Sequence, residues 1–384
     1  MSDLLAVFGA RIFDGFDWHD HAALLVEFGH VAGVVPSDAI PAHAERIDLD
    51  GGCVVPGFID LQVNGGGGVL FNNDPSVSAI RTILAAHAQF GTTALLPTLI
   101  TDTVEVNLAA MQAGREAARL AIPGFLGLHL EGPHLSVARK GTHDPSLIRP
   151  MTDEDLNRLL ALRAELPNLL ITVAAETVTP AQIAALSAAG IVVSIGHSDA
   201  GSLVGGEAFA AGASMVTHLF NAMSQLGNRE PGIVGTALSD DPIHAGLIAD
   251  GIHVHPAAIK IALRAKAGPG RLFLVTDAMS QTGTDLQTLQ LNGRTITRSA
   301  GALRLSDGTL AGADLDMISA VRFMISQIDI SFEEAIRMAS LYPAEALGIA
   351  EGLGHLQTGA VASFVHLSHT TTVQGTWIAA QRAY

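Results

Sequence analysis

The chain has 384 residues, of which 48% are hydrophobic and only 15% are charged. Soluble globular chains carry about 25% charged residues, so most of this sequence must be buried or half-buried, and overall disorder is excluded. The excess of 37 acidic over 21 basic residues gives a net charge of −16, which repels nucleic-acid phosphates and anionic membrane surfaces. We therefore expect neither nucleic acid nor a membrane as a partner.

Cysteine usage and the absence of targeting segments indicate the compartment. Cys53 is the only cysteine, so the chain can form no intrachain disulfide and no thiolate metal site of its own. The first residues lack the pattern of a secretory signal, and no apolar stretch reaches the ~18 residues of a membrane span. We expect a cytoplasmic protein.

Both ends of the chain have the pattern of β structure. Residues 1–55 alternate short apolar runs with Gly, Asp and Pro and show no helical period, which predicts a small antiparallel β unit. The last residues, TGAVASFVHLSHTTTVQGTWIAAQRAY, show the same pattern. Because chain ends commonly lie close together, we expect residues 1–54 and 351–384 to form one discontinuous β-sandwich domain.

Residues 55–350 have a different pattern, in which short apolar runs alternate with helix-like stretches rich in Ala, Leu, Glu and Arg. This alternation indicates βα units around a parallel sheet. Eight such units close a TIM-like (β/α)8 barrel in about 250 residues, so the predicted fold class is α/β. The eight runs are GFIDLQV (57–63), TTALLPT (92–98), FLGLHLE (125–131), LLITVAAE (169–176), IVVSIGH (191–197), MVTHLF (215–220), HAGLIAD (244–250) and LFLVTD (272–277).

Two further segments follow the eighth predicted strand. Segment 280–312 contains Asn-Gly and Asp-Gly dipeptides between apolar runs, which predicts a β-hairpin insertion. Residues 314–348 have a helical pattern interrupted by loop residues. We expect this last helical region to complete the catalytic barrel domain, which would span residues 55–350.

Four predicted strands end in a residue that can bind a metal or move a proton. In a barrel, catalytic groups come from the C-terminal ends of several strands. One such residue alone is more often a turn or cap residue than a ligand, but this explanation is weak for four strand ends together. The four residues are Glu131, His197, His218 and Asp277.

Two histidines and one glutamate with an open fourth position form the ligand set of a hydrolytic zinc site. In such a site the metal lowers the pKa of its water from 15.7 to about 7. Asp277 can then accept the water proton and return it to a departing amine. We expect one divalent metal ion, with zinc in first place and Fe²⁺, Co²⁺ or Mn²⁺ as alternatives.

Nine segments between about residues 50 and 350 form an ordered series of motifs. They are PGFIDLQVNGGGGVLFN (56–72), LPTLITD (96–102), GLHLEGPHL (127–135), KGTHDP (140–145), GIVVSIGHSDA (190–200), THLFNAM (217–223), NREPGIVG (228–235), ADGIHV (249–254) and LVTDAM (274–279). In order and spacing they resemble the N-acetylglucosamine-6-phosphate deacetylases of the amidohydrolase superfamily. The resemblance implies metal-dependent removal of acetate from N-acetyl-D-glucosamine 6-phosphate, which gives D-glucosamine 6-phosphate.

The end of the first predicted strand departs from the wider superfamily, which often places a His-x-His pair there. Here those positions hold Gln62 and Asn64, two amides that cannot serve as ordinary nitrogen ligands. Binuclear members often add a carbamylated lysine, but none of the three lysines of this chain ends an apolar run. We therefore predict a single-metal site, a form that the resembled family includes with the same Gln-x-Asn.

The resemblance also implies roles for individual residues. It makes Glu131, His197 and His218 the metal ligands and Asp277 the acid/base. It places His143 on the acetamido carbonyl of the substrate. The expected substrate-binding residues are Thr142 on the sugar, Asn221, Ala222 and Arg229 on the phosphate, Asp250 and His253 on the sugar-phosphate wall, and Leu310, Ala311 and Gly312 along the pocket.

For Arg229 the resemblance implies a contact between subunits. In the resembled family the matching residue reaches the phosphate of the neighbouring subunit, which implies a homodimer. An anionic substrate meeting a chain of charge −16 needs local positive groups, and Arg229 and His253 are two of few candidates in these loops. A surface ion pair is the alternative role for Arg229, and packing against Pro256 is the alternative for His253.

Other interpretations stay open at this point. The nearest rival is an amidohydrolase acting on another small amide, such as an N-acyl amino acid or a cyclic imide. A non-catalytic barrel scaffold is a second, which the four intact strand-end residues oppose. His129 lies two residues before Glu131 and faces the same side of its strand. We expect a lumen histidine bonded to a neighbour there rather than a second ligand.

Overall fold

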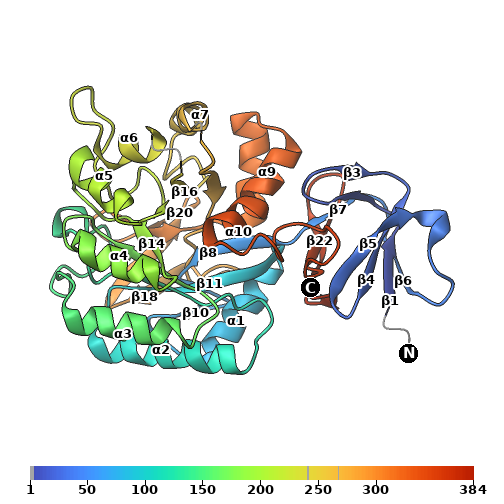
Figure 1. The fold of residues 1–384 in the computed structure, drawn as a ribbon, viewed down its shortest axis with the longest axis horizontal. Helices are drawn as coiled ribbons and strands as arrows, with labels where there is room; N and C mark the ends of the chain where they lie inside the picture. Colours follow the sequence, from blue (N-terminus) through green and yellow to red (C-terminus); the bar gives the residue numbers. More distant parts are fainter. Residues whose placement is uncertain (1–3, 240–241, 267) are drawn as a thin grey trace.

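The structure is a computed structural model that describes residues 4–239, 242–266 and 268–384. Figure 1 shows two parts side by side, a barrel with its helices on the left and a β part on the right. Both termini lie on the β part. The expected two-part architecture is therefore confirmed.

The β part contains strands from both ends of the chain. One sheet has the order β5-β4-β1-β6, and the other has the order β24-β23-β22-β7-β2-β3, in which β22 pairs with β7. The bounds are β1 (Leu4–Phe8), β2 (Arg11–Phe13), β3 (Trp18–His19), β4 (Ala22–Glu27), β5 (His30–Pro36), β6 (Glu45–Asp48), β7 (Cys53–Pro56), β22 (Phe364–Leu367), β23 (Val373–Ile378) and β24 (Gln381–Arg382).

One detail of the predicted β unit is wrong. β1 pairs with β6 in parallel, and β2 pairs with β7 in parallel, so the N-terminal unit is mixed rather than antiparallel. Apolar side chains of both sheets, among them Leu24 and Phe364, form one buried cluster between them. Alternation of apolar residues predicts which face is buried but does not determine strand direction.

The eight strands predicted for the barrel form one parallel sheet in chain order. The backbone N–H of Asp277 donates to the carbonyl of Gln62 (3.0 Å), so the first and last strands meet and the sheet nearly closes. The strands are β8 (Phe58–Val63), β11 (Thr92–Ile100), β12 (Leu128–Glu131), β13 (Leu169–Val173), β14 (Val192–Ile195), β15 (Met215–Val216), β16 (His244–Leu247) and β17 (Leu272–Leu274).

Helices follow the strands and cover the outside of the barrel (Figure 1). Hydroxyl side chains begin several of them, for example Thr103 and Thr152, whose Oγ accepts a backbone N–H of the first turn. No helix in the described ranges is long and apolar enough to cross a membrane. The helices are α1 (Val77–Ala88), α2 (Val104–Arg119), α3 (Asp153–Arg163), α4 (Pro180–Ala188), α5 (Ser202–Ala210), α6 (Gly232–Ser239), α7 (Pro256–Ala265), α8 (Met317–Phe323), α9 (Phe332–Ala339) and α10 (Leu341–Leu347), with short turns η1 (Ser37–Ala39), η2 (Val137–Arg139) and a π-helical turn η3 (Met324–Ile328).

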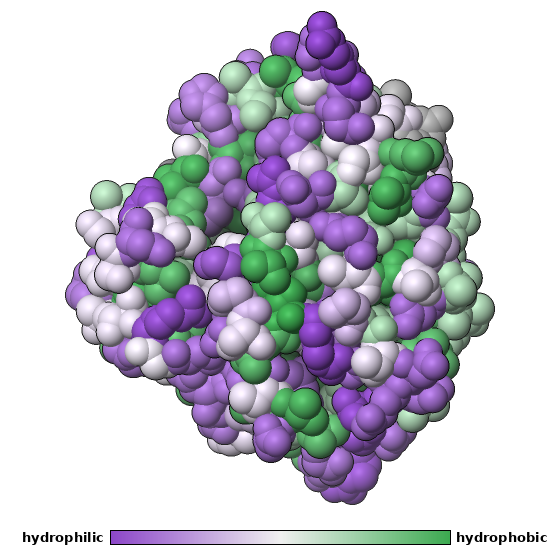
Figure 2. Space-filling view, turned by 90° about the vertical axis from the view of Figure 1, so that its left-hand side faces the viewer, coloured by the Kyte–Doolittle hydropathy of each residue, from purple (hydrophilic) through white to green (hydrophobic). Residues whose placement is uncertain are grey.

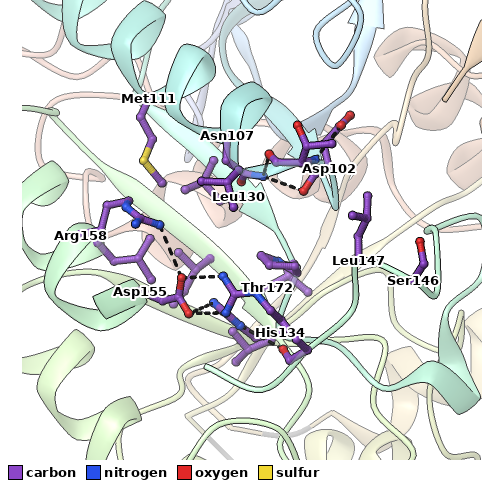
Figure 3. Close-up of a pocket in the computed structure, with 18 residues that line it drawn as sticks. Asp102, Asn107, Met111, Leu130, His134, Ser146, Leu147, Asp155, Arg158 and Thr172 are labelled. Atoms are coloured by element: carbon purple, nitrogen blue, oxygen red, sulfur yellow. Dashed lines mark hydrogen bonds and ion pairs between the residues drawn. The ribbon is translucent and has the colours of Figure 1, made fainter. Parts of the chain in front are cut away.

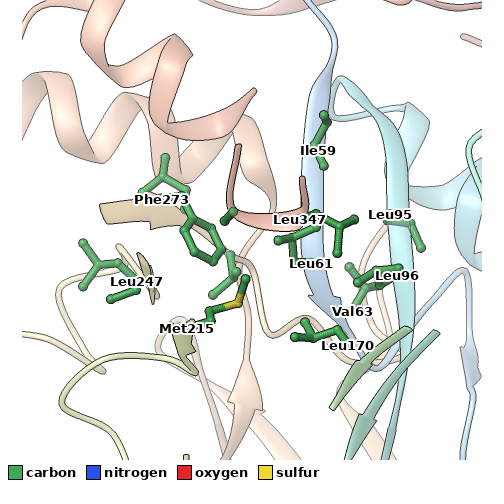
Figure 4. Close-up of a cluster of buried hydrophobic side chains, with 14 of the residues drawn as sticks. Ile59, Leu61, Val63, Leu95, Leu96, Leu170, Met215, Leu247, Phe273 and Leu347 are labelled. Carbon is green, nitrogen blue, oxygen red and sulfur yellow. The ribbon is translucent and has the colours of Figure 1, made fainter. Parts of the chain in front are cut away.

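β8 shows how the strands separate core from lumen. Its residues Ile59, Leu61 and Val63 lie in the apolar cluster drawn in Figure 4, where Leu347 of α10 is also placed. The alternate residues of the same segment are polar and buried, and they include Gln62 and Asn64. Successive side chains of a strand point to opposite faces, so one face joins the helices and the other lines the barrel.

The insertion predicted for residues 280–312 is confirmed and is larger than one hairpin. Four antiparallel strands form a sheet of their own, here called the insertion sheet. The Asn292–Gly293 turn has positive φ at both residues (49° and 73°), as a tight hairpin turn requires. The strands are β18 (Thr288–Leu291), β19 (Arg294–Ser299), β20 (Ala302–Arg304) and β21 (Leu310–Ala313); the short pair β9 (Gly65–Gly66) and β10 (Val69–Leu70) follows β8.

Candidate active site

The strand ends place four polar side chains together at one end of the barrel. Glu131 is the last residue of β12, whereas His197, His218 and Asp277 follow β14, β15 and β17 by a few residues. These last three have positive φ (48°, 31° and 50°), which L-residues with side chains adopt at a cost. Such strained residues cluster at functional sites, so the backbone conformation at these three residues indicates a functional site at this end of the barrel.

Three ligand atoms converge there. His197 Nε2, His218 Nε2 and Glu131 Oε1 each lie 3.1 Å from the other two. A tetrahedral ion with bonds of about 2.0 Å holds its ligands about 3.3 Å apart, so the triangle has the size of three tetrahedral ligand positions. All three side chains are buried.

The tautomer of His197 supports a metal at this point. Its Nδ1 lies 2.8 Å from the carbonyl oxygen of Arg139, so Nδ1 carries the proton and donates. In the neutral ring, Nε2 then carries no proton, and its lone pair faces the acceptor oxygen Oε1 of Glu131. Two such acceptors at 3.1 Å repel each other unless a cation binds between them, so these residues fit a divalent metal.

His143 lies beside this triangle but is held differently. One of its ring nitrogens lies within 4.8 Å of ligand atoms of Glu131 and His197. The backbone N–H of Thr101 donates to His143 Nδ1 (3.3 Å), and Thr101 Oγ1 lies 2.8 Å from the same atom. The ring proton is therefore on Nε2. We assign His218 as the third ligand because its 3.1 Å contacts are shorter.

Burial keeps His143 neutral. Burial lowers the pKa of His143 well below its ordinary value. A neutral ring with its proton on Nε2 is a hydrogen-bond donor that carries no charge of its own. His143 can thus donate to a carbonyl oxygen on which negative charge develops.

Asp277 has the environment of an acid/base. Asn64 Nδ2 donates to Asp277 Oδ1 (2.7 Å), and Gln62 Nε2 lies 3.3 Å from the same oxygen. Gln62 also contacts both carboxylate oxygens of Glu131 (3.3 and 3.4 Å). Burial, with the charge of Glu131 adding to it, raises the pKa of Asp277 to about 6. A carboxyl with a pKa near neutrality can both take and return a proton.

A cavity of about 510 Å³, here called the barrel pocket, is lined by the three converging ligands together with Asn64, His143 and Asp277. Of the fourteen residues predicted for the site, eleven line it. They are Glu131, Thr142, His143, His197, His218, Asn221, Ala222, His253, Asp277, Leu310 and Gly312.

Three predicted residues do not line the barrel pocket. Asp250 Oδ2 lies 2.6 Å from His253 Nδ1, so Asp250 holds the His253 ring instead. Ala311 is fully buried in the apolar cluster below the insertion sheet. Arg229 is exposed in the loop before α6. For these three positions the sequence motif located the right loops but not the direction of each side chain.

Sequence reasoning missed several lining residues. Arg304, Gly308 and Thr309 come from the insertion sheet, and Arg139 comes from η2. The Asp-Gly turn at 307–308 was a signal for a hairpin but not for its position over the pocket. Thr101, which contacts His143, was also missed, although it is the second-last residue of the motif LPTLITD.

His129 is confirmed as a lumen histidine bonded to its neighbours. Its Nε2 lies 2.7 Å from Thr172 Oγ1, and its Nδ1 lies 3.3 Å from Thr98 Oγ1. Both ring nitrogens are therefore engaged by neighbouring strands. Burial lowers the pKa of His129 to about 4, so the ring is neutral.

A second cavity, of about 180 Å³, lies between α2 and α3 on the outer face of β12 and β13 (Figure 3). We call it the outer cavity. Asp155 accepts from both Nη atoms of Arg149 and also pairs with Arg158 (3.5 Å). Its walls include Asp102, Asn107, Met111, Leu130, His134, Ser146, Leu147, Arg149, Asp155, Arg158 and Thr172.

Comparisons with known proteins cover almost the whole chain. The amidohydrolase family profile matches residues 53–382. The N-acetylgalactosamine-6-phosphate deacetylase of Shewanella sp. (strain ANA-3) is 42% identical over 99% of this chain and 96% of its own length. The N-acetylglucosamine-6-phosphate deacetylase of Haemophilus influenzae is 34% identical over 97% of each chain. The crystal structure of N-acetylglucosamine-6-phosphate deacetylase from Pasteurella multocida has a TM-score of 0.95 at 36% identity and covers 99% of both chains.

Proposed function

This chain belongs to the amidohydrolase family, and from that premise we propose that it removes acetate from N-acetyl-D-glucosamine 6-phosphate. The products are D-glucosamine 6-phosphate and acetate. The observation that carries the proposal is the meeting of the ligand triangle, Asp277 and His143 in one pocket. N-acetyl-D-galactosamine 6-phosphate is a second candidate substrate, favoured by the 42% identical relative.

The metal would be held by Glu131, His197 and His218. When bound, a divalent ion supplies the Lewis acidity that polarises a carbonyl and lowers the pKa of water. Zinc is the ion we propose, since two histidines and one carboxylate are a zinc ligand set. Fe²⁺, Co²⁺ and Mn²⁺ accept the same ligands.

The chain's own residues carry the proton transfers. Asp277 takes a proton from the attacking water and later gives it to the amide nitrogen, so that the C–N bond breaks and the amine departs. The Nε2–H of His143 donates to the acetamide oxygen and stabilises the negative charge of the tetrahedral state. Gln62 and Asn64 donate to the carboxylates and hold Asp277 in place.

The rest of the pocket would bind the sugar phosphate. We assign Thr142, Leu310 and Gly312 to the sugar ring and Asn221, Ala222 and His253 to the phosphate end. Asp250 acts through the His253 ring that it contacts. Free backbone N–H groups after a strand are suited to an anion, which supports the assignment of Asn221 and Ala222.

We also propose a homodimer in which Arg229 reaches the neighbouring pocket. Arg229 is exposed and lies outside the pocket of its own chain. Figure 2 shows apolar areas among hydrophilic ones on the side of the molecule that carries α5, where Leu203, Val204 and Leu226 are exposed. Exposed apolar side chains near Arg229, which pairs with none of the described carboxylates, support contact with a second subunit.

We also propose a division of the chain into two domains and a cellular compartment. We place the discontinuous β domain at residues 1–54 and 351–384 and the barrel at 55–350. The first boundary falls within β7, the strand that precedes β8 of the barrel with only Gly57 between them. The contact between the two is specific: Trp18 Nε1 donates to Glu333 Oε1 (2.7 Å), and its ring stacks on Phe332. A cytoplasmic location fits a sugar-phosphate substrate.

Acetate release tests the function. Metal-replete protein would be incubated with the 6-phosphates of N-acetylglucosamine and N-acetylgalactosamine, with unphosphorylated N-acetylglucosamine and with an N-acyl amino acid, each with and without a chelator. We expect chelator-sensitive release that is much faster from a phosphorylated sugar than from the unphosphorylated sugar or the N-acyl amino acid. Release from the N-acyl amino acid alone would reassign the substrate, and release from none would contradict the proposal. The ratio of the two phosphorylated sugars identifies the preferred epimer.

A further inference from the structure

The insertion sheet lies across the mouth of the barrel pocket. Arg294 Nη2 donates to the carbonyl oxygen of Thr142 (2.5 Å), which joins the sheet to the loop that carries His143. At the other side, the turn at Gly301 lies against Ile252, the residue before His253. The sheet therefore connects the loops on both sides of the pocket, and residues of the sheet, among them Arg304 and Leu310, line the pocket.

Few positive groups face this pocket. Among its described lining residues, the two guanidinium groups belong to Arg139 and Arg304. Arg139 Nε lies 2.7 Å from Asp199 Oδ1, so its charge is already paired. Arg304 donates Nη1 to the carbonyl oxygen of Gly308 (3.0 Å) and forms no ion pair with any described carboxylate. Its charge and most of its N–H donors are available to an anion.

The position of Arg304 is set by its strand and turn. It ends β20 opposite Leu310 of β21, which also lines the pocket. Gly308 has a φ of +87°, a conformation that suits glycine and allows the tight turn whose carbonyl holds the guanidinium. The acidic residue of the same turn, Asp307, accepts instead from the backbone N–H of Thr309 (2.9 Å).

We propose that Arg304 binds the phosphate group of the substrate, so that the chain supplies a phosphate-binding cation from its own insertion sheet. The inference rests on the proposed function for the identity of the substrate. A guanidinium presents forked N–H donors that match two phosphate oxygens. In a chain of net charge −16, an unpaired guanidinium at the mouth of an acidic pocket selects a phosphorylated sugar over a neutral one.

Steady-state kinetics with N-acetylhexosamine 6-phosphate test this role. A charge-assisted contact from an exposed side chain contributes to binding of substrate and transition state alike, so Arg304→Ala should raise KM about tenfold and leave kcat within about twofold. Arg304→Lys should recover part of the loss. KM for the unphosphorylated sugar should not change. The KM difference should shrink as salt is added, because the group is exposed.

Arg298→Ala is the matched control. Arg298 lies on β19 of the same sheet, but its Nε pairs with Asp314 Oδ2 (2.8 Å) away from the barrel pocket. An unchanged KM in Arg304→Ala, or an equal rise in KM for the neutral sugar, would overturn the proposal, since the second result is that of a structural residue. The same rise in Arg298→Ala would overturn it too.

Inorganic phosphate separates this proposal from the function itself. Its binding to the metal-replete protein can be measured by calorimetry without turnover. Weaker phosphate binding in Arg304→Ala than in the unsubstituted chain supports the inference even if no amino sugar is hydrolysed. Equal phosphate binding in both contradicts it, whatever substrate the enzyme uses.

Discussion

The barrel pocket and the outer cavity lie on opposite sides of β12, where Glu131 faces the first and Leu130 faces the second. Each is lined by an aspartate, buried in the case of Asp155 and half-buried in the case of Asp277, and the pKa values of the two carboxyls are shifted in opposite directions. Although burial alone would raise the pKa of Asp155, the hydrogen bonds from Arg149 and Thr152 hold it well below its usual value. No arginine of the described residues forms an ion pair with Asp277, and burial raises the pKa of Asp277 to about 6.

This difference separates a structural carboxylate from a reactive one. In the outer cavity the fold supplies two arginines and the Thr152 cap to one carboxylate. In the barrel pocket, Glu131 and Asp277 share the amide of Gln62, and the Nε2 lone pair of His197 faces a carboxylate oxygen of Glu131. Groups that the protein leaves incompletely paired are those that a metal and a substrate can engage.

Asp277→Asn should give the largest effect on activity. The amide cannot accept a proton from water, so kcat should fall by at least about 10²-fold. The free energy of unfolding should stay equal or rise, because a carboxyl with a raised pKa is already costly to bury as an anion. Turnover, metal content and urea unfolding would be measured on the same preparation. Near-normal kcat in a metal-loaded variant would remove Asp277 from its role.

Asp155→Asn should show the reverse behaviour. Loss of its charged hydrogen bonds should lower the free energy of unfolding by about 1–3 kcal/mol at pH 7, with kcat/KM within about threefold. Asp153→Asn, at the exposed first position of the same helix, controls for the change of helix-terminal charge. Urea unfolding of both variants checks the prediction. A loss of activity without a loss of stability would show that the outer cavity takes part in the reaction.

The lowered pKa of Asp155 also predicts that the stabilisation lost in Asp155→Asn depends on pH. Because the pKa of Asp155 is lower in the folded than in the unfolded chain, the unfolded chain binds more protons as the pH falls below the ordinary value of 3.8. The carboxylate therefore stabilises the fold above that pH, and its contribution is lost on acidification. The stability difference between the unsubstituted chain and Asp155→Asn should shrink below pH 4. A constant difference down to pH 3 would argue against this carboxylate as its source.

The sequence predicted the features that depend on local pattern. Eight apolar runs separated by helical stretches located the barrel strands, and the polar residues at the strand ends located Glu131, His197, His218 and Asp277. Side-chain direction beyond the strands could not be predicted in this way. Ala311 and Arg304 lie in the same insertion, yet one is buried and the other lines the pocket, because the register of β20 and β21 depends on long-range packing.

Thr101 and Asp102 are adjacent in the sequence, but each lies beside a different one of the two cavities. Thr101 contacts His143 beside the barrel pocket, whereas Asp102 lines the outer cavity. Thr101→Val keeps the backbone N–H that fixes the tautomer but removes the hydroxyl at 2.8 Å, so we expect kcat to fall about two- to tenfold with KM nearly unchanged.

Two further variants decide whether the Thr101 hydroxyl acts through His143. Thr101→Ser retains the hydroxyl and should restore kcat, since the missing methyl group is not the part that contacts Nδ1. Asp102→Asn changes the neighbouring side chain on the other side of the strand and should leave kcat unchanged. If serine fails to restore turnover, or if Asp102→Asn lowers kcat equally, the effect comes from packing at the end of β11. The orientation of His143 would then depend on the backbone N–H alone, and its ring would need no second contact to hold a proton at Nε2.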